Sequence, residues 1–262
     1  MLSRRSFLAL PLISLVLPRL AAADAGQQVS RTCDAEIGIL FNLITFSLRG
    51  RIEEQIDFAA GRYQVKLTGQ GAGVTTRTEG EGIIRDGRFK PARVESVHTV
   101  RRHDNRTTLA YDYERGLVEY HSVSYTFLLG RRRQADDVLR LRPEQQVDDL
   151  FSAELNFAAN KLDVDPDGAY RVTVVRRARP ADEGPDDIKQ GNYGAEFATL
   201  RFHAVPEAPG GRLSARMDLS GFSSWARTNK PALVAFASDR HLESIESSMI
   251  LGTSFTLRFA AA

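Results

Sequence analysis

The stretch "GIIRDGRFKPARVESVHTV", residues 82–100, decides the fold class of this chain. Its two extended runs flank Asp86-Gly87, a dipeptide that strongly favours a tight hairpin turn. The following stretch, "RTTLAYDYERGLVEYHSVSYTF" (106–127), repeats the pattern with Arg115-Gly116 at the turn. Because parallel strands need long crossovers, strands joined by such short turns pair in antiparallel fashion.

The same pattern extends in both directions from this centre. Towards the N-terminus, "GILFNLITFSL" (38–48) predicts one strand, and "RIEEQIDFAAGRYQVKLTGQG" (51–71) predicts two strands around Ala60-Gly61. Towards the C-terminus, strand-length runs cover 169–178, 195–205, 211–221, 232–239, 241–250 and 253–260. So many strands in one sheet must curl or close to bury a face. We therefore expect an all-β, mainly antiparallel protein with one large curled sheet, a barrel or half-barrel, in a single domain over 26–262.

Two polar segments interrupt the strands and predict loops. Residues 128–146 include Arg131-Arg132-Arg133, which would suit an anionic head group or would be compensated by Asp136 and Asp137. The second segment, 177–194, is rich in Pro, Gly and Asp.

One amphipathic helix is expected near 148–162, within "VDDLFSAELNFAAN" (147–160). Its apolar stripe consists of Leu150, Phe151, Leu155, Ala158 and Leu162. Asp148 or Asp149 is well placed as the N-cap. Adjacent carboxylates suit paired acid–base catalysis poorly, and no histidine near in sequence activates Ser152. Capping is therefore the interpretation that we adopt.

Residues 1–25 have the organisation of a cleavable export signal. Arg4 and Arg5 precede an apolar run, and small residues permit cleavage after Ala25 or Ala23. The Arg-Arg pair favours the twin-arginine route. The run is about half as long as a membrane-spanning helix, so we expect no transmembrane anchor after processing. The expected location is the periplasm.

The composition and net charge of the chain limit the kinds of partner that we expect. The chain is 42% hydrophobic and 26% charged, which excludes general disorder. Its formal net charge is +2, and Arg4, Arg5 and Arg19 less Asp24 account for that charge within the signal. The mature chain is near neutral, so we expect no nucleic-acid partner. Cys33 is the only cysteine, so an intrachain disulfide is impossible and an unpaired or interchain thiol is expected.

The sequence contains no recognisable catalytic, cofactor-binding or metal-binding motif. The five histidines, His98, His103, His121, His203 and His241, do not form a metal-binding pair of the HExxH kind. Serine-hydrolase, phosphate-loop and dinucleotide motifs are also absent from the sequence. "GQGAG" (69–73) favours a kink or bulge in a sheet. An enzyme is the less favoured class, and we expect no cofactor.

Tyr111 and Tyr113 lie at strand spacing with Asp112 between them, so both rings point to one face. Two interpretations follow. The rings line a ligand cavity as ligand-facing residues, or they pack in the core while a nearby arginine holds Asp112. The packing interpretation is the more ordinary one.

The run 101–120, the stretch "VDDLFSAELNF" and the closing "DRHLESIESSMILGTSFTLRF" together resemble a family of exported bacterial β-proteins known as a domain of unknown function. Tyr111-Asp112-Tyr113 and the segment 149–153 carry the resemblance. It implies an envelope location and a large curled antiparallel sheet with an inserted helix. It implies no reaction and no catalytic residue.

Three functions follow from these observations. The first is a non-catalytic periplasmic protein that binds a lipid or other amphiphilic ligand, or an envelope partner, in or on a curled sheet. The second is an exported hydrolase of envelope material, which requires a histidine in contact with both a carboxylate and a nucleophile. The third is a structural module without a ligand, whose interior its own side chains fill.

Overall fold

A computed structural model of the protein describes residues 26–39, 44–100, 102–126, 130–180, 193–206, 212–221, 223, 226–227 and 229–261. The predicted signal segment, with Arg4, Arg5, Ala23 and Ala25, lies outside the described residues, as does most of the predicted loop over 177–194.

The first half of the described chain is an uninterrupted series of strands. These are β1 (Gln27–Ile39), β2 (Ile44–Asp57), β3 (Arg62–Gly71), β4 (Val74–Arg85), β5 (Arg88–Val100), β6 (His103–Asp112), β7 (Leu117–Tyr125) and β8 (Arg132–Arg140). The second half contains the helix α1 (Leu150–Ala158), β9 (Asp163–Val164), β10 (Tyr170–Arg177), β11 (Ala195–Phe202), β12 (Ala204–Pro206), β13 (Leu213–Met217), β14 (Ala232–Phe236), β15 (Leu242–Ser248), the short 3₁₀-helix η1 (Ile250–Gly252) and β16 (Ser254–Ala261).

The strands form two sheets. The large sheet has 13 strands in the order β12-β13-β14-β15-β16-β1-β2-β3-β4-β5-β6-β7-β8, and every neighbouring pair in it is antiparallel. The small sheet has the order β11-β10-β9. The predicted all-β class and large antiparallel sheet are therefore confirmed. The large sheet ends at β12 and β8 and does not close, so the half-barrel is the correct form.

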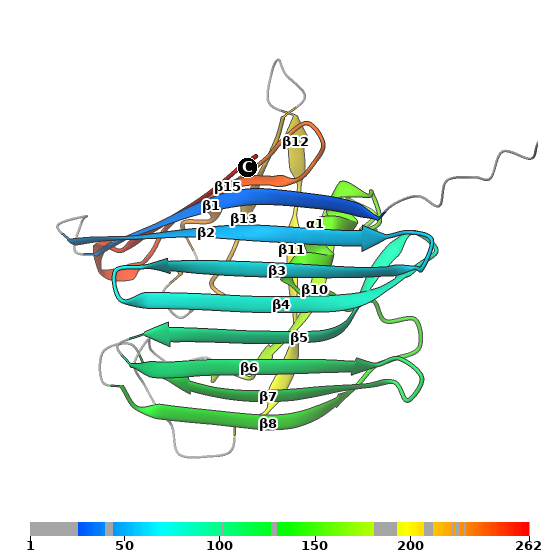
Figure 1. The fold of residues 1–262 in the computed structure, drawn as a ribbon, viewed down its shortest axis with the longest axis horizontal. Coiled ribbons are helices and arrows are strands. Elements are labelled where there is room, and N and C mark those ends of the chain that lie inside the picture. The colour runs from blue at the N-terminus through cyan, green and yellow to red at the C-terminus, as the bar shows by residue number, and fades with distance from the viewer. Residues whose placement is uncertain are drawn as a thin grey trace, which may run out of the picture.

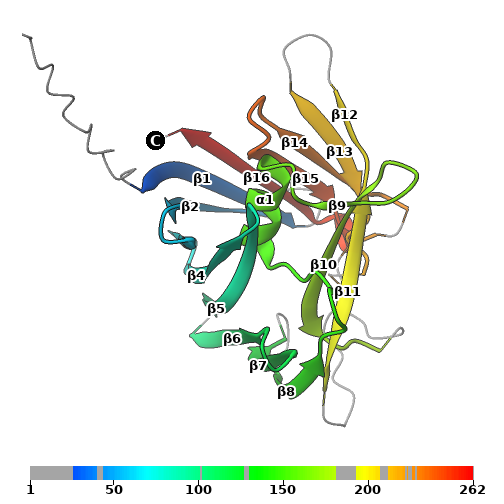
Figure 2. The same ribbon diagram turned by 90° about the vertical axis from the view of Figure 1, so that its right-hand side faces the viewer.

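The large sheet curls around α1 (Figures 1 and 2). In Figure 2, β10 and β11 stand across the open side of the curl, and β11 contacts both β8 and β13. Three buried apolar clusters hold these layers together. One of them joins α1 to β2, β3 and β5, and another joins β5–β8 to β10 and β11. The small sheet therefore spans the gap that the open half-barrel leaves.

The predicted hairpin turns occur where the sequence placed them. Between β4 and β5, Asp86 and Gly87 have φ values of 55° and 74°, the left-handed conformation that a tight hairpin turn requires. Gly61 and Gly116 have φ values of 63° and 64° at the turns after β2 and β6. The glycine-rich segment 69–73 also forms a hairpin turn, between β3 and β4.

Two sequence-based boundaries were wrong. Residues 38–48 are not one strand, because β1 ends and β2 begins within them, and Ile39 pairs with Ile44. Strand β1 also begins at Gln27, well before the first predicted strand at 38–48. Its inward positions include Arg31 and Cys33, which do not give the alternation of apolar residues that marks a half-buried strand.

The predicted loop over 128–146 was also partly wrong, because Arg132–Arg140 form β8. Along its outer face, Arg132 donates to Gln134 at 2.8 Å, and Gln134 donates to Asp136 at 2.7 Å. When polar side chains bond to one another along an exposed face, the strand lacks the hydrophobic periodicity from which strands are predicted. On the inner face, Ala135 is buried.

Within the part of the chain that the structure describes, no helix has the length and apolar character needed to cross a bilayer.

Candidate functional site

Helix α1 is positioned first by its N-cap. It occupies Leu150–Ala158, inside the predicted 148–162 segment. The backbone N–H of Ser152 donates to Asp149 Oδ1 at 2.7 Å, and the Asp149 N–H donates to Ser152 Oγ at 2.8 Å. This reciprocal capping box satisfies two donors that the helix start leaves free. The capping interpretation is confirmed for Asp149.

Asp148 has a different role, because it fastens α1 to the sheet. Its Oδ2 accepts from Arg88 on β5 at 2.9 Å, and its Oδ1 accepts from Asn156 Nδ2 at 2.7 Å. The Asn156 amide also bonds both backbone groups of Phe89, each at 2.8 Å. These bonds bring both ends of α1 against β5.

Burial of the two carboxyls costs energy in their charged forms. Desolvation raises the pKa of Asp149 to about 6, against the lowering effect of hydrogen bonds from Ser152 and Phe151. Desolvation also raises the pKa of Asp148 to about 6, although the Arg88 guanidinium acts in the opposite direction. Both residues therefore titrate well above a free aspartate.

A second buried network fastens the middle of α1 to the other side of the curl. The Arg31 guanidinium on β1 lies 2.5 Å from Glu54 on β2 and 2.8 Å from Glu154 on α1. Glu154 also accepts from the Leu242 N–H at 3.1 Å and lies 3.5 Å from His241 Nδ1. Removing Arg31 would leave two carboxylates buried without their cation.

This network is also the place where a metal would be sought. Among the described residues, Glu54, Glu154 and His241 have ligand atoms within 4.8 Å of one another. The Arg31 guanidinium already lies between the two carboxylates, so a side chain supplies the positive charge there. The geometry is that of an ion-pair network, and the residues give no argument for a bound metal.

Tyr111 and Tyr113 are placed in the core. Their rings stack with centroids 6.3 Å apart, and Tyr111 is buried in the cluster of β5–β8. Asp112 points the other way, 3.8 Å from Arg115, as the packing interpretation expects. Burial raises the pKa of both phenols, with Asp148 and Asp149 adding to the effect. Their role as ligand-facing residues stays a prediction.

Beyond α1, the strand register arranges the inner face of the sheet into rows with distinct chemistry. One row consists of Thr78, Ser96, Thr107 and Ser122, each paired with the next across β4–β7; we call it the hydroxyl row. Ser96 Oγ donates to Thr78 Oγ1 at 3.1 Å, and the hydroxyls of Thr107 and Ser122 lie 3.2 Å apart. Two residues further along β5, His98 Nδ1 lies 2.6 Å from Thr76 Oγ1.

The inward direction of the hydroxyl row follows from its neighbours. Val94, Leu109 and Tyr120 are buried in the core and lie two positions from Ser96, Thr107 and Ser122 on the same strands. Residues two apart on a strand face the same side. Exposure rises along each strand away from α1, so that His98 is exposed although it is on the inner face.

A second region of the same inner face, on β16, β1, β2 and β3, is apolar. Its side chains, here called the apolar wall, are Ile37 on β1, Phe46 and Leu48 on β2, Leu67 on β3, and Phe255 and Leu257 on β16. Ile37 pairs with both Phe46 and Phe255, and Ala35 pairs with both Leu48 and Leu257. All six side chains are half-buried, so this wall keeps apolar surface in contact with solvent.

The outer faces of the same strands are different in kind. Arg77 lies 2.9 Å from Glu79, and Arg106 lies 2.9 Å from Asp104. Such exposed pairs contribute little to stability but keep the convex surface polar. Apart from Arg88, which bonds Asp148 inside the curl, charge on β4–β6 is concentrated on the outer face, while hydroxyl and apolar groups occupy the inner face.

Glycines make room where the sheet bends around α1. A Cβ on Gly80 would lie 2.7 Å from Cδ2 of Phe151, a helix residue that packs on β4. A Cβ on Gly50 would lie 2.2 Å from the Thr68 carbonyl oxygen and 2.7 Å from Cys33 Sγ. Cys33 is thus a buried inner-face thiol, and the strands approach it closely at a residue without a side chain.

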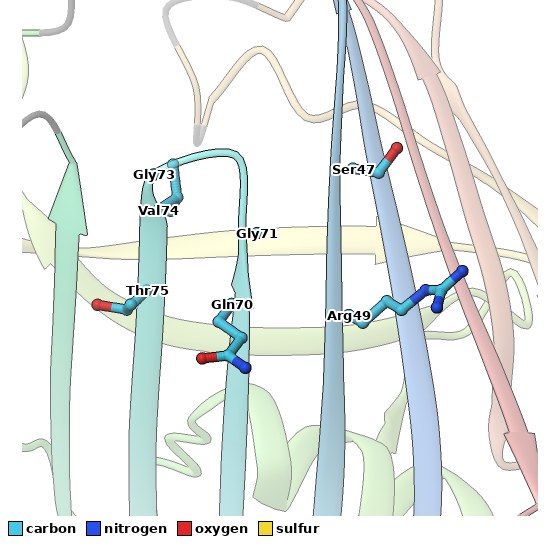
Figure 3. Close-up of a pocket in the computed structure, with 7 residues that line it drawn as sticks. All are labelled: Ser47, Arg49, Gln70, Gly71, Gly73, Val74 and Thr75. Carbon is cyan, nitrogen blue, oxygen red and sulfur yellow. The ribbon is translucent and has the colours of Figure 1, made fainter.

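A groove of about 760 Å³ lies at the end of the β3–β4 hairpin, lined by Ser47, Arg49, Gln70, Gly71, Gly73, Val74 and Thr75. Figure 3 shows that its side chains diverge, with Arg49 and Thr75 pointing away from each other. Gly71 forms its tightest point, because a Cβ there would lie 2.2 Å from the Ser47 carbonyl oxygen. Ser47, Arg49, Gln70 and Thr75 occupy outward positions, so the groove does not lie on the face of the apolar wall.

The histidines are dispersed. His121 contacts Asp136 at 2.8 Å on the outer face, His241 contacts Glu154, and His98 contacts a threonine hydroxyl. In the contacts of the described residues, none of these three joins a carboxylate to a nucleophile as the hydrolase hypothesis requires.

Comparison with known proteins gives distant likenesses to solved structures. No family model and no curated protein matches the chain. A solved structure described as a β-barrel-like protein of the domain of unknown function DUF1849 from Brucella abortus is similar over 89% of this chain and 96% of its own. The sequences are 11% identical, and the TM-score is 0.41. The family resemblance seen in the sequence stays a prediction, and the function is argued from this chain's own residues.

Sequence reasoning missed the hydroxyl row and the Arg31 network. In the hydroxyl row, each strand contributes one small polar residue, which by itself looks like an ordinary strand position. In the network, Arg31, Glu54, Glu154 and His241 come from four separate segments. A signal was present only in β7, where "VEYHSVSY" places Tyr120, Ser122 and Ser124 on the inner side.

Proposed function

We propose that this protein is an exported periplasmic protein that binds an amphiphilic molecule on the inner face of its half-barrel and does not act as a catalyst. The Arg4-Arg5 signal supports the location. The observation that carries the binding proposal is the pairing of the apolar wall with the hydroxyl row on one concave face.

The physical reason is complementarity. Half-buried apolar side chains on a concave surface gain about 25 cal/mol for each Å² that a ligand chain covers. Ser96 and Thr107 of the hydroxyl row are partly exposed and offer hydrogen-bond partners to a polar end that lies beside the chain, whereas Thr78 and Ser122 are buried and bond to them. A purely structural module would instead bury this face with its own side chains. His98 shows that, among the described residues, part of it is exposed.

The test compares two neighbouring residues on β2. Leu48 belongs to the apolar wall, whereas Arg49 points outward and its side chain is 91% exposed. We expect Leu48→Asn to weaken binding of a fluorescent fatty-alcohol probe about tenfold or more, because it replaces an apolar contact with a polar one. Arg49→Asn should leave binding unchanged. Equal binding by both variants would contradict the proposed site.

A further inference from the structure

We propose that the polar end of the bound molecule is a neutral, polyhydroxylated group such as a sugar or glycerol head, with its acyl or alkyl chain on the apolar wall. This inference rests on the proposed function and names the class of ligand. It follows from the chemistry of the hydroxyl row and its neighbours on β4–β7.

The hydroxyl row presents both hydrogen-bond donors and hydrogen-bond acceptors. Each hydroxyl offers one donor and two lone pairs. In the bonded pairs Ser96–Thr78 and Thr107–Ser122, one O–H is used in each pair, so each pair keeps a donor as well as acceptors. A polyol likewise carries both hydrogen-bond donors and acceptors. A phosphate or carboxylate carries acceptors only and calls for Arg or Lys.

The inward side chains of β4–β7, from the hydroxyl row to the open end, include no acidic or basic residue other than histidine. The inward positions of β4–β7 from the hydroxyl row to the open end are Val74, Thr76, Thr78, Ser96, His98, Val100, His103, Asn105, Thr107, Ser122 and Ser124. None of these is an Asp, Glu, Lys or Arg, whereas the outward positions of the same strands include Arg77, Glu79 and Arg106. Partial desolvation also lowers the pKa of His98, although the residue is exposed, and so favours its neutral ring. Between β4 and β7 the inner face therefore suits an uncharged head group, and this uncharged region ends at β8, where Arg133 pairs with Ser124 and lies on the same side.

The apolar wall and the hydroxyl row lie next to each other on the sheet. Leu67 on β3 pairs with Thr78 on β4, so the apolar wall and the hydroxyl row meet directly in one register row. Gly50 and Gly69 pair in the adjacent row and present no side chain there. A molecule lying across the strands would pass from apolar to hydroxyl surface within neighbouring strands. An amphiphile with a small polyol head has this sequence of chemistry.

The experiment measures binding to the full-length processed protein by calorimetry, with three ten-carbon probes kept below their micelle concentrations. Decyl maltoside and monodecanoyl glycerol carry neutral polyol heads, and decyl phosphate carries an anionic head. We expect one or both polyol probes to bind at least tenfold more tightly than decyl phosphate. The two polyol probes distinguish a sugar from a glycerol source.

Matched variants locate the head group. The double variant Thr107→Val with Ser122→Ala removes two hydroxyls with little change of volume, and it should weaken binding of the preferred polyol probe about tenfold. Thr108→Val, one residue away on the outer face, should not. If the double variant fails to fold, as judged by circular dichroism, Ser96→Ala provides the same test.

The outcomes separate the two proposals. Tight decyl phosphate binding, or polyol binding that the loss of hydroxyls does not affect, would overturn the neutral-head inference while leaving an amphiphile site in place. Failure of all three probes, and of the fatty-alcohol probe, would overturn the proposed function itself.

Discussion

Asp149 and Ser152 cap helix α1 reciprocally, with each backbone N–H donating to the other residue's side chain at 2.8 and 2.7 Å. The doubled carboxylate in "VDDLF" thus divides into two structural roles. Asp149 starts the helix, and Asp148 ties it to Arg88 on the sheet. These contacts hold α1 in the curl and leave the rest of the inner face to the hydroxyl row and the apolar wall.

The first prediction concerns the cap. Asp149→Ala should lower the free energy of unfolding by about 1 kcal/mol, because it removes the acceptor for the Ser152 N–H. Asp149→Asn should retain most of this stability, since asparagine caps equally well. Urea denaturation measures both. A loss for the asparagine variant as large as that for alanine would contradict the capping role.

Asp148→Ala should cost more than loss of a cap, about 3 kcal/mol. Asp148 and Arg88 are both buried, and the substitution leaves the guanidinium without its carboxylate partner. The matched control is Asp112→Ala, which removes an exposed carboxylate 3.8 Å from Arg115 and should cost under about 1 kcal/mol. Similar losses for the two variants would show that the buried pair does not fasten α1.

The raised pKa of Asp149 gives a pH dependence with a definite sign. Its folded-state pKa is about 6 and its unfolded value is near 3.8, so between these values the folded state binds more protons. The stability of the wild type should therefore fall relative to Asp149→Asn as pH rises from 4 to 6, by at most about 1.4 kcal/mol per unit. Paired denaturation curves across this range measure the difference. A flat or rising difference would contradict the burial argument.

The Arg31 network predicts a large effect on the opposite side of α1. Arg31→Met should destabilise the protein by about 3 kcal/mol, because Glu54 and Glu154 then lose their buried cation. Arg49→Met removes an exposed arginine 3.7 Å from Asp34 and serves as the control, with an expected cost below about 1 kcal/mol. Thermal denaturation measures both variants, and a small effect of Arg31→Met would mean that the network is dispensable.

Gly80 should tolerate no side chain while Phe151 is present. Gly80→Ala places a Cβ 2.7 Å from the phenyl ring and should cost about 1–3 kcal/mol by overpacking. In a Phe151→Leu background the same substitution should cost clearly less. Gly221→Ala meets no neighbouring atom within 4 Å and is the control. Additive effects of the two substitutions would contradict the packing of α1 against β4.

The sequence was sufficient to predict the fold class, because its evidence is local. Asp86-Gly87 and Arg115-Gly116 mark turns, and the alternation in Tyr63, Val65 and Leu67 marks a half-buried strand. The helix and its cap are also local features. The open form of the half-barrel was one of two predicted forms, since closure depends on β12 and β8, which are far apart in sequence.

The candidate site could not be predicted in the same way. The hydroxyl row exists only through the register that aligns Thr78, Ser96, Thr107 and Ser122 on four strands. Strand β8 was missed because its outer side chains are polar and bond along the strand. Hydrophobic periodicity does not record either relationship.

The most direct test of amphiphile binding is photolabelling of the processed protein with a diazirine placed in the alkyl chain of decyl maltoside, followed by peptide mapping. We expect adducts on the inner side of the curl, centred on Leu48, Leu67 and Leu257, and their loss in competition with unlabelled decyl maltoside. Adducts confined to outward residues such as Arg49 and Thr75, or labelling that no competitor reduces, would contradict a ligand site on the inner face.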